Sequence, residues 1–499
     1  MPDMLLGIDI GTSSSKGVLA QPDGQIVATV ERPHALSLPH PGWAEHDAEG
    51  IWWEDVLAIC AELVPLAGGG LSGVSVSGIG PCCLLADNEG QPLRPAILYG
   101  IDTRAVREIE EQTSRFGADA ILRRCGSALT TQAIGPKLAW LRRHEPEGWA
   151  RGCRMFMASS YTVFKLTGEY VLDHHSASQC DPFYDLENSQ WITEWAAEIA
   201  PGIMLPRLLW PAEMAGTVSK AGAAATGIPV GTPVAAGTVD AWAEALSANV
   251  REPGDTMLMY GTTMFLVDVL QTPSRHPAFW CTQGILPGTT TLAAGMATSG
   301  ALTGWLRQIA GDIPYETLVR EASTVPAGAE GLVALPYFAG ERTPLFDPDA
   351  RGMLFGLTLS HGRGHLYRAL LEATAFGVRH IFDVLRETGA QGTRLVAVGG
   401  GTRGGLWTQI VSDVTGRQQE IPAVTIGASY GDALLAGLAS GIVPATARWN
   451  RPTETVVPNP ANRDIYHRLY MLYRELYPLT RVQAHMLASI QREGGPGGS

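Results

Sequence analysis

Short apolar runs alternate with amphipathic stretches along most of the chain, and this alternation indicates an α/β protein. The runs are bounded by residues that favour turns, and Asp23-Gly24 between two of them is a hairpin signal. Stretches in which apolar residues recur every three or four positions predict helices. In the first half of the chain the expected strands are 5–10, 17–20, 26–30 and 71–79, and the expected helices are 48–65, 103–116, 136–144, 159–166 and 190–199.

A second cycle of the same pattern begins near residue 255. Strand-like runs at 256–260 and 264–270 enclose a Gly-Thr-Thr turn, just as 5–10 precedes a Gly-Thr-Ser turn in the first cycle. Two such hairpins half a chain apart predict two similar α/β domains with a cleft between them, although Gly-Thr turns are common in any chain with 58 glycines. The expected domains are 1–250 and 251–485, with a Gly-rich flexible tail over 486–499.

Composition narrows the class of protein. The 499 residues, of which 45% are hydrophobic and 17% charged, suffice for two or three folded domains. The net charge of −13 argues against nucleic acid and anionic membrane partners but allows local phosphate binding by backbone N–H groups. The seven cysteines lack a C-x-x-C pair, which argues against zinc and disulfides and for a reducing compartment. No secretory signal or transmembrane helix is expected, so we predict a soluble cytoplasmic protein.

The first candidate site is the stretch 7–16. Its apolar strand carries Asp9 and then turns at Gly11 through four hydroxyl residues to Lys16. Such a turn presents successive N–H groups to phosphate oxygens, Lys16 adds positive charge, and Asp9 would hold a hydrated Mg²⁺. The spacing is not that of a Walker A loop. The alternative interpretation is a plain Ser-rich hairpin with a solvated lysine.

A second glycine-rich stretch, 399–405, follows a short apolar run and precedes a helix expected at 406–414. It fits the G-x-G-x-x-G pattern of dinucleotide-binding folds, with Glu420 near the expected acidic position, so a nicotinamide oxidoreductase is one alternative. The pattern lies so close to the C-terminal end of the sequence that few residues remain to form the rest of a dinucleotide-binding sheet. The other interpretation is a glycine platform beneath a nucleotide base or α-phosphate.

The candidate general base is Asp240, which follows a strand-like run at 234–236 and begins a helix. A carboxylate in this place would take the proton from a substrate hydroxyl as the oxygen attacks the γ-phosphorus of ATP. It precedes the expected domain boundary and would therefore face the cleft. The alternative is an ordinary acidic residue in the first turn of a helix, where the helix dipole favours it.

Together these motifs resemble the FGGY family of carbohydrate kinases, within the actin-like ATPase superfamily, over nearly the whole chain. The resemblance rests on 7–16, 238–244, 259–263, 352–372 and 399–401 with Trp407, Gln409 and Asp413. The stretches 41–45 and 340–344 further resemble the xylulokinase-like branch. The resemblance implies an α/β fold of two ribonuclease-H-like domains of the actin-like ATPase fold around a central cleft.

The resemblance also implies roles for individual residues. Asp240 would be the catalytic base, Asp9 would hold Mg²⁺ through water, and the nucleotide would be ATP. Contacts to ATP would come from Gly11, Thr12, Ser13, Ser14, Lys16, Gly261, Thr262, Gly300, Gly400 and Gly404. In the sugar site, Gly80 and Pro81 stand where bacterial members of that branch carry a Met-His pair, and Asp102 would accept sugar hydroxyls beside Asp240.

The resulting prediction is an ATP-dependent sugar kinase whose substrate is a ketopentose such as D-xylulose, giving xylulose 5-phosphate in xylose metabolism. Alternatives are a kinase for another ketose or polyol (ribulose, deoxyxylulose or a glycerol-like compound) and a non-kinase actin-like ATP-binding protein. Gly404 stands where the family often has Ser or Asn against the adenine, so nucleotide selectivity stays open, as does assembly as a homodimer. The expected partners are the sugar and ATP, without nucleic acid or membrane.

Overall fold

The computed structural model describes residues 3–390 and 392–493, which form two compact units. Unit 1 contains the chain up to Pro253 with Val269–Thr291 and Ile426–Arg451, and unit 2 contains Gly254–Asp268, Leu292–Thr425 and the chain from Pro452 on. The expected boundary at 250/251 lies near the first change of unit, but two later segments return to unit 1. Of the expected tail, residues 486–493 are the end of helix α16 (Arg463–Glu493), and 494–499 lie outside the described residues.

Unit 1 is built on a mixed sheet of order β13-β14-β5-β1-β2-β3, with a short β15 also paired to β5. Its strands are β1 (Met4–Ile10), β2 (Ser14–Ala20), β3 (Ile26–Pro33), β5 (Leu71–Gly78), β13 (Met214–Thr217), β14 (Pro233–Ala235) and β15 (Thr238–Val239). The first three are antiparallel neighbours, whereas β5 runs parallel to β1, and β14 and β15 run parallel to β5. The strands predicted at the start of the chain are thereby confirmed.

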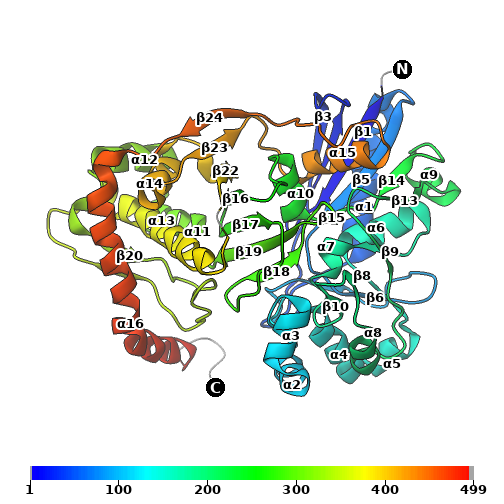
Figure 1. The fold of residues 1–499 in the computed structure, drawn as a ribbon, viewed down its shortest axis with the longest axis horizontal. Coiled ribbons are helices and arrows are strands. Elements are labelled where there is room, and N and C mark those ends of the chain that lie inside the picture. Colours follow the sequence, from blue (N-terminus) through cyan, green and yellow to red (C-terminus); the bar gives the residue numbers. More distant parts are fainter. Residues whose placement is uncertain (1–2, 391, 494–499) are drawn as a thin grey trace. The chain divides into compact units, whose positions relative to one another are not determined.

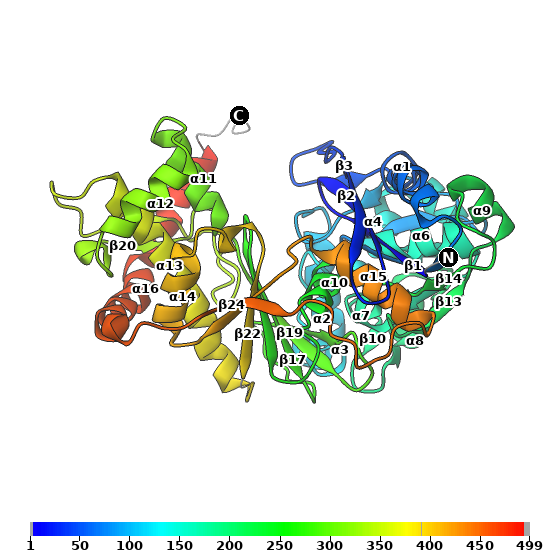
Figure 2. The ribbon, with the colours of Figure 1, turned by 90° about the horizontal axis from the view of Figure 1, so that it is seen from above.

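Helices cover both faces of this sheet. Those that matter for the site are α1 (Glu54–Leu63), α6 (Ala158–Thr167), α10 (Asp240–Ser247) and α15 (Ala428–Ala439). Gly7 on β1 faces α15, where a Cβ would lie 2.0 Å from the Ser429 carbonyl oxygen, and Gly17 on β2 faces α1 on the opposite side (Figure 1). Helices α15 and α10 lie side by side in Figure 2. They can approach closely because Gly431 has no side chain, and a Cβ there would collide with the backbone of α10.

The helix predicted over 48–65 is divided in two. A π-helical turn, η1 (Ala48–Trp53), precedes α1, and the Asp47 side chain begins it by accepting two backbone N–H groups. The other predicted helices of this region are confirmed as α2 (Val106–Phe116), α4 (Ile134–His144), α6 and α8 (Thr193–Ile199). The remaining elements of unit 1 are β4 (Glu45–His46), η2 (Pro65–Ala67), β6 (Leu84–Ala86), β7 (Ala96–Ile97), α2 (Val106–Phe116), α3 (Ala118–Cys125), α4 (Ile134–His144), α5 (Pro146–Arg151), β8 (Arg154–Phe156), β9 (Val171–Asp173), α7 (His174–Ala177), β10 (Tyr184–Asp185), β11 (Gln190–Trp191), α8 (Thr193–Ile199), β12 (Arg207–Leu209), α9 (Lys220–Thr226) and β18 (Trp280–Gln283).

Unit 2 repeats the central arrangement of unit 1. Its strands β19-β17-β16-β22-β23-β24 lie in this order, and β16 forms an antiparallel hairpin with β17 and a parallel pair with β22, as β1 does with β2 and β5. The strands are β16 (Asp255–Tyr260), β17 (Met264–Leu270), β19 (Thr290–Met296), β22 (Arg394–Val398), β23 (Gln419–Pro422) and β24 (Pro452–Val456). The repeated hairpin that the sequence predicts is therefore present in both units.

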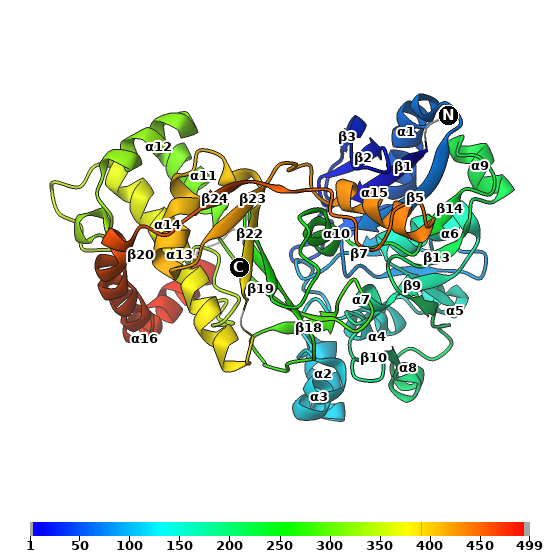
Figure 3. The ribbon, with the colours of Figure 1, turned by 45° about the horizontal axis from the view of Figure 1, so that its top comes forward.

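Long helices pack beside the sheet of unit 2. Figure 3 shows α13 (Arg363–Glu387) and α14 (Leu406–Thr415) together next to β22, with α16 farther out. The elements besides its strands are α11 (Gly300–Ile309), α12 (Tyr315–Thr324), η3 (Ala329–Gly331), β20 (Val333–Leu335), β21 (Met353–Phe355), α13 (Arg363–Glu387), η4 (Gly400–Thr402), α14 (Leu406–Thr415), η5 (Pro460–Asn462) and α16. Within residues 3–390 and 392–493, no helix has both the length and the apolar character needed to cross a lipid bilayer.

Candidate active site

The ends of three parallel strands bring Asp9, Ser77 and Asp240 to one edge of the sheet of unit 1. Asp9 of β1 lies opposite Ser77 of β5, and β15, paired to the end of β5, leads directly into Asp240. Parallel strands end at the same edge, so polar residues far apart in the sequence meet there. In open α/β sheets this carboxyl edge is where ligands bind.

The turn between β1 and β2 presents backbone N–H groups at the same edge. The Gly11 N–H donates to the Ser14 carbonyl oxygen over 3.0 Å and closes the turn. In the described part of the chain, no protein acceptor pairs with the N–H of Thr12 or Ser13. Successive unpaired N–H groups in a tight turn form a concavity that suits phosphate oxygens.

Ser14 and Lys16 contact Glu31 of the neighbouring strand β3. The Ser14 hydroxyl donates to Glu31 Oε1 over 2.9 Å, and Lys16 Nζ lies 3.8 Å from the same oxygen. Both contacts are solvent-exposed and therefore weak. A phosphate at the turn could draw Ser14 and Lys16 away from Glu31 at little cost.

Three carboxylates at this edge raise one another's affinity for protons. Burial, and then the charge of Asp240, raise the pKa of Asp9 to about 8, although Lys16 opposes the shift. Burial raises the pKa of Asp240 to about 7, with a further contribution from Glu244. Glu244 itself has a pKa raised to about 7 by burial and by the charge of Asp9. Such a cluster favours the binding of a cation, which would take the place of the protons.

The oxygen donors at this edge fit a magnesium ion held partly by water. Mg²⁺ prefers hard oxygen ligands and usually keeps several waters beside one or two carboxylates and substrate phosphates. Among the described residues, Asp9 Oδ1 receives only a long contact of 3.5 Å from the Ser77 hydroxyl, which leaves it able to accept from a metal-bound water. Among the residues that the structure describes, no three His, Cys, Asp or Glu side chains are placed to bind a metal together.

Asp240 begins α10 with its carboxylate at the sheet edge. The N–H of Ala241 donates to Asp240 Oδ1 over 2.7 Å and fixes the orientation of the side chain. Glu244 follows one helical turn later, on the same face of α10. Asp432 of the adjacent α15 is fully buried, and burial raises its pKa well above the ordinary value. The candidate base therefore stands among three further acids.

The segments predicted to bind sugar adjoin the phosphate turn. Tyr99 and Thr12 place their hydroxyl oxygens 3.2 Å apart, which joins the segment 99–104 to the turn. Gly80 lies against Val239, where a Cβ would be 2.6 Å from the valine Cγ2, and Pro81 beside it is buried. Val239 directly precedes Asp240, so the two residues expected in the sugar site lie next to the candidate base.

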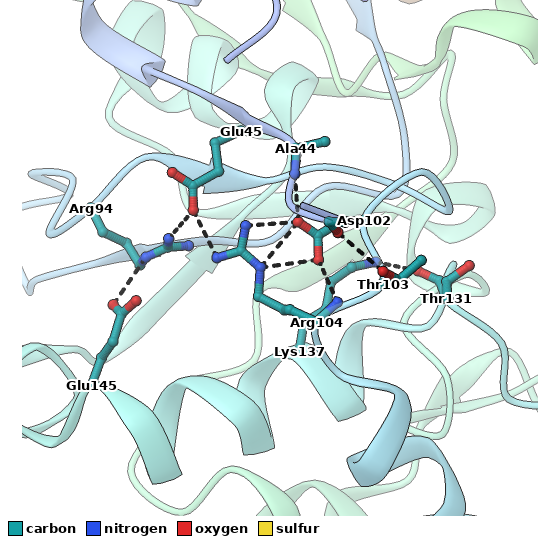
Figure 4. Close-up of polar contacts among 10 residues, drawn as sticks. Ala44, Glu45, Arg94, Asp102, Thr103, Arg104, Thr131, Lys137 and Glu145 are labelled. Atoms are coloured by element: carbon teal, nitrogen blue, oxygen red, sulfur yellow. Dashed lines mark hydrogen bonds and ion pairs between the residues drawn. The ribbon is translucent and has the colours of Figure 1, made fainter. Parts of the chain in front are cut away.

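Asp102, predicted to accept sugar hydroxyls, is already engaged within the protein (Figure 4). Its carboxylate accepts the Ala44 N–H over 2.8 Å and the Arg104 guanidinium over 2.7 to 3.0 Å. Arg104 also donates to Glu45 over 2.7 Å and lies 3.9 Å from the ring centre of Trp43. Asp102 thus anchors its own segment, and its contact with a sugar stays a prediction.

In unit 2 the turn between β16 and β17 packs on the start of α11. The Gly300 N–H donates to the Gly261 carbonyl oxygen over 3.0 Å, and the N–H groups of Ser299 and Ala301 donate to that of Thr262 over 3.1 and 3.0 Å. A Cβ at Gly300 would lie 2.5 Å from the Gly261 oxygen. The structure thus brings Gly261, Thr262 and Gly300 together.

The glycine platform of unit 2 follows β22. A Cβ at Gly400 or Gly404 would meet no atom within 4 Å, so both face open space, and Gly404 has a φ of +86°, which favours glycine. Trp407 donates to the Thr374 hydroxyl over 2.9 Å, and the Gln409 amide donates to Asp413 over 2.7 Å. The side chains of α14 therefore stabilise unit 2, and their part in binding adenosine stays a prediction.

Sequence reasoning missed three residues at the edge of unit 1: Ser77, Glu244 and Asp432. Glu244 had a local signal, because a spacing of four residues from Asp240 places both acids on one helix face. Ser77 and Asp432 had none. They reach the site only through the pairing of β5 with β1 and the packing of α15 on both strands.

Comparison with known proteins gives consistent matches over most of the chain. The N-terminal domain of the FGGY family of carbohydrate kinases matches residues 4–247, and its C-terminal domain matches 256–440. The xylulose kinase of Bacillus subtilis is 27% identical over 488 residues, which covers 96% of this chain and 97% of that protein. A glycerol kinase of Nocardia farcinica is 30% identical over 482 residues, covering 92% and 95%. The crystal structure of xylulose kinase from Rhodospirillum rubrum has a TM-score of 0.89 and 34% identity, covering 97% of this chain and 100% of that one.

Proposed function

We propose that this chain, which belongs to the FGGY family of carbohydrate kinases, phosphorylates D-xylulose with ATP and forms xylulose 5-phosphate. Membership in the family makes it an ATP-dependent sugar kinase and confirms the predicted fold, two α/β domains of the actin-like ATPase type. The choice of a ketopentose is supported by the xylulose kinases of Bacillus subtilis and Rhodospirillum rubrum.

The observation that carries this proposal is the position of Asp240 beside Asp9 and the N–H groups of the Gly11 turn. A buried carboxylate with a pKa raised to about 7 is matched to taking a proton from an alcohol near neutral pH. We assign Asp240 as the base that orients and deprotonates the sugar hydroxyl. The turn residues Gly11, Thr12, Ser13 and Ser14, with Lys16, would hold the phosphates.

The divalent ion is proposed to be Mg²⁺, held by Asp9 through water. When bound, Mg²⁺ supplies positive charge that offsets the negative charge of the phosphates. Asp9, near the end of β1, would hold the ion through its water ligands, and Lys16, its partner on β2, would add a second positive charge. In unit 2, Gly261, Thr262, Gly300, Gly400 and Gly404 are the proposed nucleotide contacts.

A glycerol-like polyol is the second candidate substrate, because the Nocardia farcinica relative at 30% identity is a glycerol kinase. A coupled ATP assay with D-xylulose, L-xylulose, D-ribulose, L-ribulose, 1-deoxy-D-xylulose, glycerol, ribitol and gluconate separates the two. We expect the highest kcat/KM for D-xylulose. A higher value for glycerol or ribitol would assign the polyol, and ADP release independent of any sugar would point to a non-kinase ATPase.

We further propose a cytoplasmic location and a homodimer. All seven cysteines are free, six of them buried, which suits a reducing compartment. Light scattering after gel filtration measures the oligomeric state directly.

A further inference from the structure

His34, which directly follows β3, binds the backbone of the phosphate turn. Its ring Nε2 lies 3.1 Å from the Gly11 carbonyl oxygen, and its own N–H donates to the Ser13 carbonyl oxygen over 2.9 Å. Ring Nδ1 lies 2.7 Å from Asp55 Oδ2 on α1. The Ser15 hydroxyl donates to the same Asp55 oxygen over 2.7 Å, which ties β2 to the same point.

Both ring nitrogens of His34 face acceptors that have no proton to give. A carbonyl oxygen and an ionised carboxylate accept hydrogen bonds, and a neutral imidazole has only one N–H to donate. Only the doubly protonated imidazolium satisfies Gly11 and Asp55 at the same time. The geometry itself therefore indicates a positively charged ring while the turn is held.

The surroundings of His34 support this charge state. Burial lowers its pKa, but the hydrogen bond and charge of Asp55 and the backbone of the turn outweigh burial, so the net pKa is raised. A second titratable group that faces the ring is His46 on β4, whose ring centre lies 5.0 Å away. Burial, and then the charge of His34, lower the pKa of His46 to about 4, and Trp52 donates to its Nδ1 over 3.1 Å. His46 is therefore neutral and does not oppose the charge on His34.

We propose that the His34 imidazolium is a positioning residue for ATP: it holds the Gly11 carbonyl away from the phosphates so that the N–H groups of Thr12 and Ser13 point toward them. A carbonyl oxygen turned toward a phosphate would repel it, whereas the N–H groups attract it. The imidazolium also places a positive charge next to the turn, because its Nε2 contacts the Gly11 carbonyl oxygen. Loss of the ring proton releases either Asp55 or Gly11, and ATP then binds more weakly. This inference rests on the proposed use of ATP at this turn.

The test compares His34→Gln and His34→Ala with the wild type by calorimetric titration with MgATP from pH 6.5 to 9.5. The Gln amide still donates to the Gly11 carbonyl but carries no charge, whereas Ala removes both interactions. Charged hydrogen bonds are strong, so we expect the Kd for MgATP at pH 7 to rise by about 10-fold to 100-fold in His34→Ala, and less in His34→Gln. The ratio of the Kd values of His34→Gln and wild type should fall toward one as the pH rises through the pKa of His34.

Two further measurements separate positioning from folding and from the proposed function. The matched control is His40→Gln, which replaces an exposed histidine that packs edge-on against Trp43. This variant should leave the Kd for MgATP unchanged. Ring ¹⁵N shifts of His34, assigned by their loss in His34→Gln, should titrate above the ordinary pKa of 6.5. Titration below that value, or unchanged MgATP binding in both His34 variants, would overturn the positioning role alone. A wild type that does not bind MgATP would overturn the proposed function together with it.

Discussion

The Ser77 hydroxyl donates a hydrogen bond of 2.6 Å to Asp432 Oδ2, although 355 residues separate the two in the chain. The same hydroxyl lies 3.5 Å from Asp9, so Ser77 stands between a buried acid of α15 and the proposed metal-binding carboxylate. The other oxygen of Asp432 is buried with no hydrogen-bond partner in the described chain. A carboxyl group in this environment is stable in its neutral, protonated form.

Asp432→Asn should stabilise the protein, and the gain should grow with pH. The unfolded chain releases the Asp432 proton near its ordinary pKa of 3.8, but the folded chain keeps it, so ionisation favours unfolding as the pH rises toward the raised folded pKa. An asparagine keeps an acceptor for Ser77 and cannot ionise. We expect a gain in unfolding free energy that increases by at most about 1.4 kcal/mol per pH unit, measured by urea unfolding between pH 5 and pH 8. Asp119→Asn, at an exposed acid of α3, should show no such trend.

Asp240→Asn should lower kcat by about 10²–10⁴-fold, the usual contribution of general-base catalysis. The substitution keeps the acceptor for the Ala241 N–H, so the fold and MgATP binding should survive. Steady-state kinetics with the preferred sugar and calorimetry with MgATP measure the two effects separately. Near-normal turnover in this variant would remove the assignment of Asp240 as the base.

Activity should fall as the pH drops below about 7, because Asp240 must be ionised to accept a proton and burial raises its pKa to about 7. Glu244→Gln removes a negative charge that raises this pKa, so the acid limb of kcat/KM should move to lower pH. The midpoint belongs to the coupled carboxylates together. A pH profile that stays in place, or moves upward, in Glu244→Gln would show that the two acids do not interact in this way.

Arg104→Ala should destabilise the protein strongly, by about 3–5 kcal/mol, because it leaves the buried Asp102 carboxylate without its cation, whereas Glu45 keeps its ion pair with Arg94. The Arg104 side chain is fully buried, and a lysine would lack the planar fork that bonds both acids. Arg107→Ala is the matched control: its pair with Glu111 is exposed, and its loss should cost less than about 0.5 kcal/mol. Equal losses in the two variants, measured by urea unfolding, would contradict the structure of this network.

The local features of the fold could be predicted from the sequence, since they follow from short-range rules. The apolar run before Gly11 is β1, the run after it lies within β2, and Asp240 begins α10 as expected. The turn after β16 and the glycine stretch after β22 also lie where the pattern placed them. These elements suffice to place the candidate base and the phosphate turns on the correct strands and helices.

The parts that could not be predicted depend on long-range packing. Helix α15 consists mostly of small and apolar residues on all its sides, so it lacks the amphipathic periodicity that reveals a surface helix. Nothing in the sequence around Asp432 indicates which residue its side chain contacts. His34 belongs to no motif, and its role depends on the position of Asp55 on α1. The sequence does not show that Arg104 folds back on Asp102, and the contact of Asp102 with a sugar stays a prediction.

The packing of α15 against β1 and β5 has a consequence for biosynthesis. These two strands leave the ribosome several hundred residues before the helix that covers one of their faces. During translation, the nascent sheet must keep an apolar surface uncovered while several hundred further residues are added, and such surfaces are prone to aggregate. A fragment ending at residue 253 would inherit the same exposed surface, so the first half of this protein should need chaperones, or the complete chain, to become soluble.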